Sequence, residues 1–267
     1  MIRIEGLSYV YEDGTEALRS IDMDFNKGRT IGIVGANGSG KSTLMLVLMG
    51  VLKSFSGRIT VDGEVLRTDR TSLRNHRKRV NMVFQDPDRQ IFYSRVYDDV
   101  AFGPRNLDMA EEDVSRRVEN SLEQVRMNGL QHKPVHFLSY GQKKRVSIAG
   151  ILSMEPQMII MDEPSSGLDP QMRESLKEII SLQSRDKRIV LSSHDMDFIY
   201  EACDYVYVIK EGQVIGEGIP KEVFLDRELL ASAHLNMPWL VRIHLELGLP
   251  LWGNCKELTG KEMEESK

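Results

Sequence analysis

A glycine-rich stretch followed by a lysine and a serine is the first feature that could do chemistry. Residues 35–42 read Gly-Ala-Asn-Gly-Ser-Gly-Lys-Ser and fit the pattern G-x-x-x-x-G-K-[S/T]. Glycines let the backbone fold around a phosphate and aim N–H groups at it, and a following helix adds its N-terminal dipole. In such a loop Lys41 contacts the β- and γ-phosphates and the Ser42 hydroxyl binds Mg²⁺. The candidate nucleotide-binding residues here are Gly35, Ala36, Asn37, Gly38, Ser39, Gly40, Lys41, Ser42 and Thr43.

Two consecutive acids end an apolar run later in the chain. Residues 158–161 read Met-Ile-Ile-Met and are followed by Asp162 and Glu163. A buried strand carries the residues at its end to the carboxyl edge of a sheet, where phosphate-binding loops also lie. We expect Asp162 to hold Mg²⁺ through its water shell, and Glu163 to polarise the attacking water as general base.

The pentapeptide Leu-Ser-Tyr-Gly-Gln at residues 138–142 begins a predicted helix, with Ser139 as a plausible N-cap. Its amides and the Ser139 hydroxyl form a second anion site, one that cannot reach the phosphate at Lys41 within a compact monomer. Here the chain resembles the ATP-binding-cassette (ABC) ATPases, whose signature L-S-G-G-Q lies just upstream of the acidic strand. Tyr140 replaces the first signature glycine, and a positive φ there would strain it, whereas Gly141 is retained.

The resemblance extends to four further residues in the family's order. Gln85 resembles the glutamine-loop residue that senses Mg²⁺ and water, and Asp169 the D-loop aspartate that reaches the opposite subunit. His194 resembles the switch histidine at the γ-phosphate, and Tyr11 the aromatic that stacks on adenine. Each alone has a commoner structural interpretation, but their joint order and spacing favour the cassette. The resemblance thus implies catalytic residues Lys41, Gln85, Glu163 and His194, metal ligands Ser42, Gln85 and Asp162, and further nucleotide contacts from Tyr11, Ser139, Gly141, Gln142 and Asp169.

An α/β fold has to position these residues. Short apolar runs predict buried strands at residues 30–34, 80–84, 158–161 and 189–191. Apolar spacing of three or four residues and favourable capping predict helices at residues 42–51, 109–128, 139–153 and 172–182. The resemblance implies a P-loop NTPase fold, with a RecA-like core, an N-terminal antiparallel β subdomain and an inserted α-helical subdomain.

The predicted domain organisation follows from the extent of the resemblance. It covers residues 1–218 as the nucleotide-binding domain, with the helical subdomain at about residues 86–157. After Pro220 the pattern changes to short helices, so residues 219–267 form a C-terminal helical extension.

The segment from Gln85 to Asn106 is more particular than the core motifs. Its sequences QDPDRQIF and DDVAFGPRN resemble the ATPases of cobalt/nickel importers and of energy-coupling-factor vitamin transporters. In those transporters this region docks the coupling helix of a transmembrane subunit. The alternative is a surface loop with a few anchoring aromatics.

The resemblance implies an ATP-hydrolysing subunit that works with Mg²⁺ in a head-to-tail pair of cassettes, identical or paralogous. An integral membrane subunit would dock near Gln85–Asn106, and a substrate-binding membrane subunit would be reached indirectly. The expected location is the cytoplasmic face of the cell membrane, as a peripheral protein. The cargo stays open between cobalt, nickel and a vitamin.

Composition bounds these hypotheses. The chain has 267 residues, 41% apolar and 28% charged, which is typical of a folded globular protein. Its net charge of −5 argues against a strongly basic nucleic-acid binder, so we expect no nucleic acid partner. The longest uncharged, mostly apolar stretch, residues 42–52, falls short of the about 20 residues of a membrane helix.

Two other classes compete with the transporter hypothesis. A soluble ABC ATPase acting in DNA repair or translation is the main alternative, but such chains carry coiled-coil insertions or tandem cassettes. This chain has one phosphate loop and no heptad insertion between Lys41 and Asp162. A small-molecule kinase is disfavoured by the signature and the switch histidine.

Overall fold

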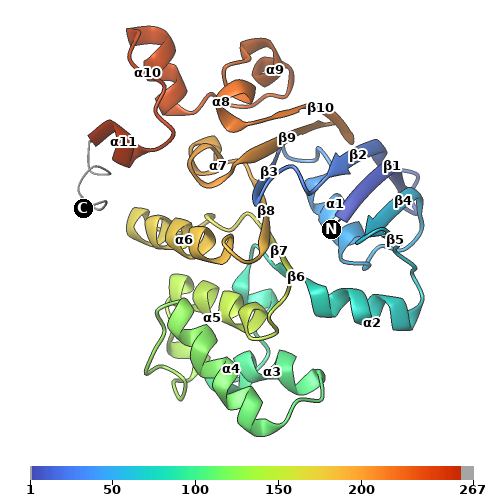
Figure 1. Ribbon diagram of the computed structural model, residues 1–267, viewed down its shortest axis with the longest axis vertical. Coiled ribbons are helices and arrows are strands. Elements are labelled where there is room, and N and C mark those ends of the chain that lie inside the picture. Colours follow the sequence, from blue (N-terminus) through green and yellow to red (C-terminus); the bar gives the residue numbers. More distant parts are fainter. Residues whose placement is uncertain (1, 260–267) are drawn as a thin grey trace. The chain divides into compact units, whose positions relative to one another are not determined.

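The computed structural model describes residues 2–259 of the chain (Figure 1). Residues 260–267, the end of the predicted extension, lie outside the described part. The chain divides into two compact units. The first consists of Met1–Leu48, Leu52–Val65 and Leu191–Lys267, and the second of Met49–Val51 and Leu66–Val190.

An antiparallel sheet in the first unit has the strand order β2-β1-β4-β5. Its strands are β1 (Ile2–Val10), β2 (Glu16–Asp24), β4 (Phe55–Val61) and β5 (Glu64–Val65). Alternate residues of β1 turn inward, and Ile4 pairs with Met23 on one side and Ile59 on the other. All three of these side chains are buried, so the register brings the apolar face of each strand together.

A second sheet in this unit carries the phosphate loop. β3 (Thr30–Val34) pairs in parallel with β9 (Tyr205–Lys210), and β9 pairs antiparallel with β10 (Gln213–Gly218). Every residue of β3 is buried, as a continuous apolar run predicts. The loop after β3 leads into α1 (Lys41–Leu48), which confirms the predicted strand–loop–helix order.

The C-terminal helices of the first unit are held against α7 (Met196–Ala202). Asp197 accepts a hydrogen bond from the Trp239 amide at 2.7 Å, and the Tyr200 hydroxyl donates to the Trp252 carbonyl at 2.7 Å. Burial raises the pKa of Tyr200 to about 12, so its hydroxyl stays protonated as a donor. These helices are α8 (Pro220–Val223), α9 (Arg227–Ser232), α10 (Trp239–Leu247) and α11 (Cys255–Thr259).

The second unit places helices around two parallel strands, β6 (Val80–Val83) and β7 (Met158–Asp162). β7 lies next to β8 (Arg188–Ser193), of which residues 188–190 belong to the second unit. Because β7 and β8 are neighbours joined through α6 (Pro170–Gln183), the predicted strand–helix–strand order is confirmed. The other elements are α2 (Arg70–Arg79), η1 (Pro87–Arg89), α3 (Val96–Asn106), α4 (Glu111–Gln124), η2 (Val135–Phe137) and α5 (Tyr140–Leu152).

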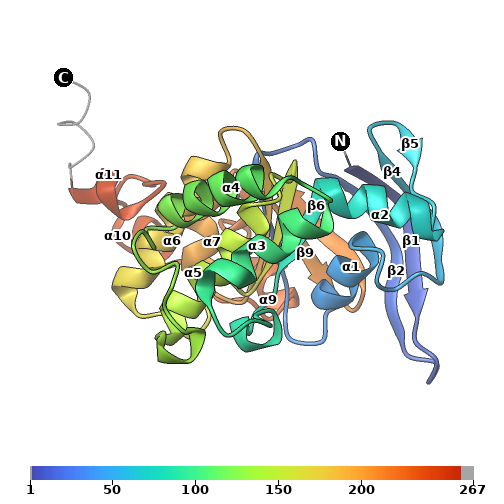
Figure 2. The same cartoon turned by 90° about the horizontal axis from the view of Figure 1, so that it is seen from below.

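Three helices of the second unit, α3, α4 and α5, pack on one another and lie side by side in both views (Figures 1 and 2). α4 buries Val114, Val118 and Leu122, the residues whose spacing predicted this helix. The observed helix is shorter at both ends than the predicted residues 109–128. At its C-terminal end the helix stops because the chain turns at Val125 and Arg126 takes a φ of 57°.

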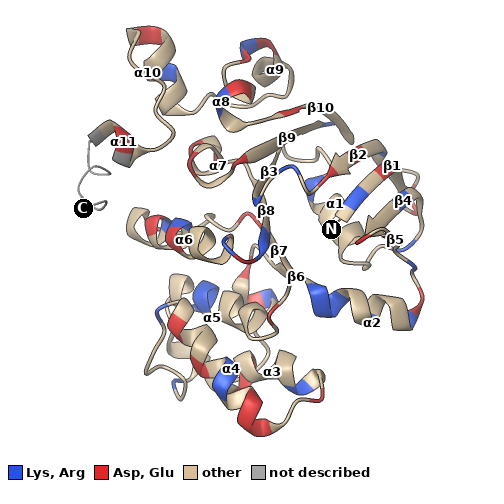
Figure 3. Ribbon diagram, in the orientation of Figure 1, with Lys and Arg blue, Asp and Glu red and all other residues tan. Residues whose placement is uncertain are grey.

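The basic stretch before β6 forms α2, where the ribbon is coloured blue at Lys and Arg residues in Figure 3. Arg74 pairs with Asp108 at 3.0 Å, and the Arg77 guanidinium donates to the Gly50 carbonyl at 3.0 Å. These basic groups therefore have partners within the second unit. Among residues 2–259, no helix combines the length and apolar character needed to cross a membrane.

Candidate nucleotide-binding site

The phosphate loop closes on its own lysine. The Lys41 ammonium donates to the Gly35 carbonyl at 2.8 Å and to the Ala36 carbonyl at 3.0 Å. Its side chain is 7% exposed, so the charge lies inside the loop rather than in solvent. A buried cation surrounded by loop backbone is a preformed partner for phosphate oxygens.

Two glycines of the loop lie where no side chain fits. A Cβ on Gly35 would meet the Ile209 carbonyl oxygen at 2.2 Å, and one on Gly40 the Ala17 carbonyl oxygen at 2.6 Å. Gly40 also has a φ of 106°, which L-residues rarely adopt. The loop conformation therefore depends on these glycines.

We expect Gly40→Ala to weaken ATP binding by more than about tenfold, because the new methyl group must displace the Ala17 backbone. Gly14→Ala is the matched control, since Gly14 has a φ of 86° but open space around its Cβ position. Both variants carry a cost of about 1 kcal/mol for the left-handed backbone. Titration of a fluorescent ATP analogue measures the difference. Equal affinities for the two variants would contradict the prediction.

Ser39 provides an unsatisfied polar atom at the centre of the loop. The residue is 5% exposed, and among the described residues its hydroxyl oxygen is buried without a hydrogen-bond partner. A buried hydroxyl normally has a partner, so an unpaired one calls for an explanation. A phosphate group bound in the loop supplies that partner, and the residues present fit a nucleotide.

Tyr11 lies beside the start of α1. Its hydroxyl hydrogen-bonds the Thr43 hydroxyl at 2.9 Å, in the first turn of α1. The Tyr9 ring packs edge-on against the Tyr11 ring, with centroids 5.0 Å apart. His194, in the same unit, is exposed at the end of β8, just before Asp195 caps α7.

The acidic pair of the second unit lies at the end of β7. Asp162 is the last residue of that buried strand, and Glu163 follows with 8% exposure. Glu163 has a φ of 44°, and its carbonyl accepts the Ser166 amide at 3.1 Å. A non-glycine residue in the left-handed region stores strain, and such residues concentrate at functional sites. Arg126 and Glu155 of the same unit share a positive φ, so the hypothesis for Glu163 depends on its place beside Asp162 at the end of a buried strand.

The D-loop follows directly. Gly167 has a φ of 74°, and Asp169 caps α6 by accepting the Met172 amide at 2.8 Å. Pro170 occupies the first turn of that helix, where its missing N–H costs nothing. The Asp169 carboxylate therefore has a local capping role in this structure.

The signature forms the start of α5. Ser139 accepts the Gln142 amide at 3.3 Å, and the Gln142 side chain accepts the Ser139 amide at 3.1 Å, which is a capping box and confirms the predicted N-cap. Tyr140 is the first helical residue and does not have a positive φ, so the strain considered for it does not arise. A Cβ on Gly141 would lie 3.1 Å from Met172, so glycine is the better-fitting residue there.

The exposed Gln85 follows β6, and its backbone is tied to α5. The Lys144 ammonium donates to the Gln85 carbonyl at 2.6 Å and to the Phe84 carbonyl at 3.1 Å. The Gln90 side chain also accepts the Phe84 amide at 3.0 Å and donates to the Ser147 carbonyl at 3.1 Å. Lys144 was not among the predicted site residues. The signal in the sequence was the spacing of Lys144 four and seven residues before Ile148 and Ile151, which places the lysine on the same helix face as two buried apolar residues.

Three aromatic side chains beyond the glutamine loop form an exposed cluster, hereafter the aromatic cluster: Phe92, Tyr93 and Phe102. Their exposed fractions are 72%, 45% and 39%, respectively. The ring centroids of Phe92 and Tyr93 lie 5.9 and 5.8 Å from the ring centroid of Phe102. Asp99 fixes the turn by accepting the amides of Phe92 and Tyr93 at 2.8 and 3.1 Å. Burial raises the pKa of Asp99, although these two N–H groups lower it.

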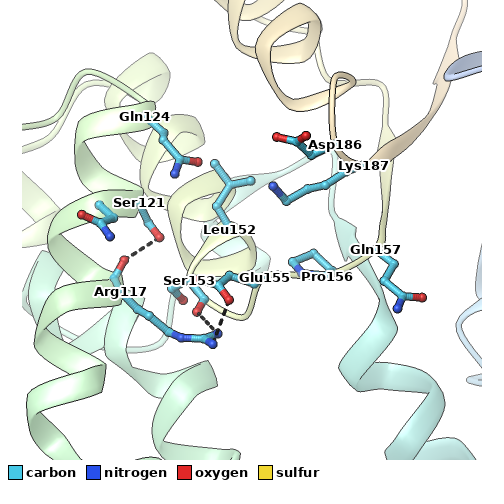
Figure 4. A pocket seen from close by; sticks show the side chains of 11 residues that line it. Arg117, Ser121, Gln124, Leu152, Ser153, Glu155, Pro156, Gln157, Asp186 and Lys187 are labelled. Carbon is cyan, nitrogen blue, oxygen red and sulfur yellow. Dashed lines mark hydrogen bonds and ion pairs between the residues drawn. The ribbon is translucent and has the colours of Figure 1, made fainter.

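A hollow of about 380 Å³ lies elsewhere in the second unit, between α4 and the end of α5 (Figure 4). The Arg117 guanidinium turns towards α5, donating to the Ser153 carbonyl at 3.2 Å and pairing with Glu155 at 2.8 Å. The Arg117 guanidinium in this hollow is therefore already bound by groups of the chain itself. None of the predicted site residues lines the hollow.

Comparison with known proteins decides the family. Residues 18–166 match the family described as ABC transporter. The chain belongs to the ABC transporter family. A putative ABC transporter ATP-binding protein of Listeria monocytogenes is 48% identical over 253 residues, 94% of each chain. The energy-coupling factor transporter ATP-binding protein EcfA of Methanosphaera stadtmanae is 43% identical, over 92% of this chain and 89% of the relative.

A solved structure of an ABC transporter protein is also similar to this chain. It is cbiO1 from Clostridium perfringens, described as part of the ABC transporter complex cbiONQ, and it superposes with a TM-score of 0.80 and 41% identity, covering 91% of this chain and 98% of that one. As an ABC transporter protein the chain has the P-loop NTPase fold that the sequence predicted, and it is an ATP-binding ATPase.

Proposed function

We propose that this chain is the ATP-hydrolysing subunit of an energy-coupling-factor-type importer that carries cobalt, nickel or a vitamin. The observation that carries the proposal is 43% identity, over 92% of this chain, with the energy-coupling factor transporter ATP-binding protein EcfA of Methanosphaera stadtmanae. The segment from Gln85 to Asn106, in which the sequence resembles this subgroup, also carries the aromatic cluster.

The nucleotide would bind first to the phosphate loop. Lys41 and the amides of residues 35–43 would hold the phosphates, and the Tyr11 ring would stack on adenine. Ser42, Asp162 and Gln85 would hold Mg²⁺, which supplies charge neutralisation between the β- and γ-phosphates when bound. Glu163 would take the proton of the attacking water, and His194 would contact the γ-phosphate.

We place the second anion site, from Ser139, Gly141 and Gln142, on the ATP of a partner cassette, with Asp169 also reaching across. Each ATP would then be enclosed by the loop of one subunit and the signature of the other, in a head-to-tail dimer. Closure of the pair transmits work only as far as the open and closed states differ in their affinity for nucleotide.

The membrane subunit would dock on the aromatic cluster, and the substrate-binding membrane subunit would be reached through it. An exposed group of aromatics is costly to leave in water and is a typical protein-binding feature. Docked in this way, the chain would lie on the cytoplasmic face of the cell membrane as a peripheral subunit. We assign residues 1–218 to the cassette, with residues 86–157 as its helical part, and residues 219–267 to an appended helical extension.

The test is the double variant Phe92→Ser, Phe102→Ser. We expect the double variant to reduce both the yield of co-purified membrane subunit and the transport-coupled rate of ATP turnover by more than about tenfold. The reason is that aromatic residues central to an interface contribute about 2 kcal/mol or more each to binding. ATP binding by the isolated chain should stay within about twofold, since no cluster residue lies in the phosphate loop. Pull-down from detergent extract and nucleotide titration measure both.

Leu182→Ser is the matched control, because Leu182 is a 45% exposed apolar residue on α6 of the same unit. An undiminished complex in the double variant would place docking elsewhere. Recovery of the wild-type chain only in a soluble complex with nucleic acid would support the rival, a soluble ABC ATPase of DNA repair or translation.

A further inference from the structure

The Gln85 carbonyl receives two donors from successive turns of the signature helix. The Tyr140 hydroxyl donates to it at 3.3 Å and the Lys144 ammonium at 2.6 Å. Residues four apart lie on one face of a helix, so both donors reach the glutamine loop from the same side of α5. Lys144 also holds the Phe84 carbonyl at 3.1 Å, where β6 has just ended.

Lys144 is buried to an extent that packing alone does not explain. Its side chain is 1% exposed, and burial lowers the pKa of Lys144 to about 8, while the carboxylates of Asp162, Asp86 and Glu163 raise it. An apolar side chain of the same length would fill this space without the desolvation cost of an ion. The Lys144 ammonium instead donates charge-assisted hydrogen bonds to two carbonyls, and such hydrogen bonds are stronger than those between neutral groups.

Tyr140 adds a contact that the family's signature glycine has no atoms to make. A Cβ on Gly167 would lie 3.0 Å from the Tyr140 ring, so the phenol packs against the D-loop while its hydroxyl reaches the glutamine loop. Burial, with Asp86 and Asp88 nearby, raises the pKa of Tyr140, so the hydroxyl remains a protonated donor.

We propose that Tyr140 and Lys144 are positioning residues that clasp the Gln85 backbone to the signature helix, so that the signature and the glutamine loop move together. The proposal rests on the proposed role of Gln85 in ATP hydrolysis. Neither residue touches the nucleotide in this scheme. They act by fixing the backbone from which the Gln85 side chain reaches the metal and the water.

The first test measures how firmly the glutamine loop is held, by amide hydrogen exchange and independently of ATP hydrolysis. In Tyr140→Phe we expect backbone amide hydrogen exchange of residues 84–90 to quicken by about threefold, since one bond to the loop is lost. Lys144→Met should quicken it by more than about tenfold, because two charge-assisted bonds are lost. Tyr205→Phe, which removes a hydroxyl in β9, should leave this segment unchanged. Unchanged exchange in both clasp variants would overturn the proposal even if the chain proved inactive.

The second test is a double-mutant cycle on ATP turnover in the complex with its membrane subunit. Tyr140→Phe should lower kcat by about threefold to tenfold and leave KM within about twofold. In a Gln85→Ala background the same change should alter kcat by less than about 1.5-fold, because a positioning residue has nothing left to position. An equal loss in both backgrounds, a rise in KM alone, or no loss in either would overturn the clasp.

A third variant guards against misfolding. Tyr140→Gly restores the family's residue, leaves Lys144 in place and removes a half-exposed side chain, so the chain should fold while losing the tyrosine arm. Amide exchange of residues 84–90 in this variant should be at least as fast as in Tyr140→Phe, and its kcat should be equally low or lower. Faster turnover than wild type would overturn the proposal. Failure of the proposed function appears separately, as recovery of the wild-type chain only in a soluble complex with nucleic acid, a result that leaves the exchange test of the clasp unaffected.

Discussion

Replacing Glu163 by glutamine should reduce steady-state ATP turnover by at least about 100-fold while leaving ATP affinity within about threefold. A positioned general base contributes about 10²–10⁴ to a rate, and the amide cannot accept the proton of the attacking water. The substitution keeps the shape of a side chain that is 8% exposed, so the surrounding packing is retained. Phosphate release and a nucleotide titration measure the two quantities separately.

Glu155→Gln is the control for this prediction. Glu155 lies in the same unit, also has a positive φ, 50°, and pairs with Arg117 at the surface rather than ending a buried strand. It should retain turnover within about twofold. If Glu163→Gln hydrolysed ATP as fast as wild type, another group would be the base. Loss of binding in the variant would instead indicate a structural role for the carboxylate.

Replacing Lys41 by methionine should weaken ATP binding by about 30-fold or more. A hydrogen bond to a charged group contributes about 1.5–3 kcal/mol, and the γ-phosphate would lose its charged partner inside a buried loop. Unfolding in the absence of nucleotide should shift little, because Lys41 is 7% exposed and an apolar chain of similar length removes the cost of its burial.

Thermal unfolding with and without ATP provides the measurement. Saturating ATP should raise the Tm of the wild-type chain, since a ligand of the native state stabilises it, and should hardly raise that of Lys41→Met. Lys53→Met is the control, because Lys53 is an exposed lysine of the same unit outside the loop. An equal rise in all three proteins would show that Lys41 does not bind the nucleotide.

Elements with strong local patterns were predicted well. The apolar run of β3, the phosphate loop after it and the capped start of α5 agree with the sequence within a residue or two. The helix α3 was not predicted, although Val96 and Val100 have helical spacing, because Gly103-Pro104 is typical of a turn. Pro104 is instead accommodated in the last turn of that helix. The seven-residue α7 was also missed, since so short an element shows hardly two periods of any pattern.

By itself the sequence determined the family, the ATPase chemistry and the contiguous motifs, because a phosphate loop, a capping box and a strand ending in acids are set by neighbouring residues. Only the tertiary structure decided the backbone conformation and the contacts of Tyr140. Its helical backbone and its contacts with Gln85 and Gly167 depend on segments that lie far apart in the chain. The same holds for Lys144, whose burial and carbonyl partners arise when α5 packs against the end of β6. Spacing along one element predicts which face is buried, but which backbone group a buried charge meets is settled only by packing.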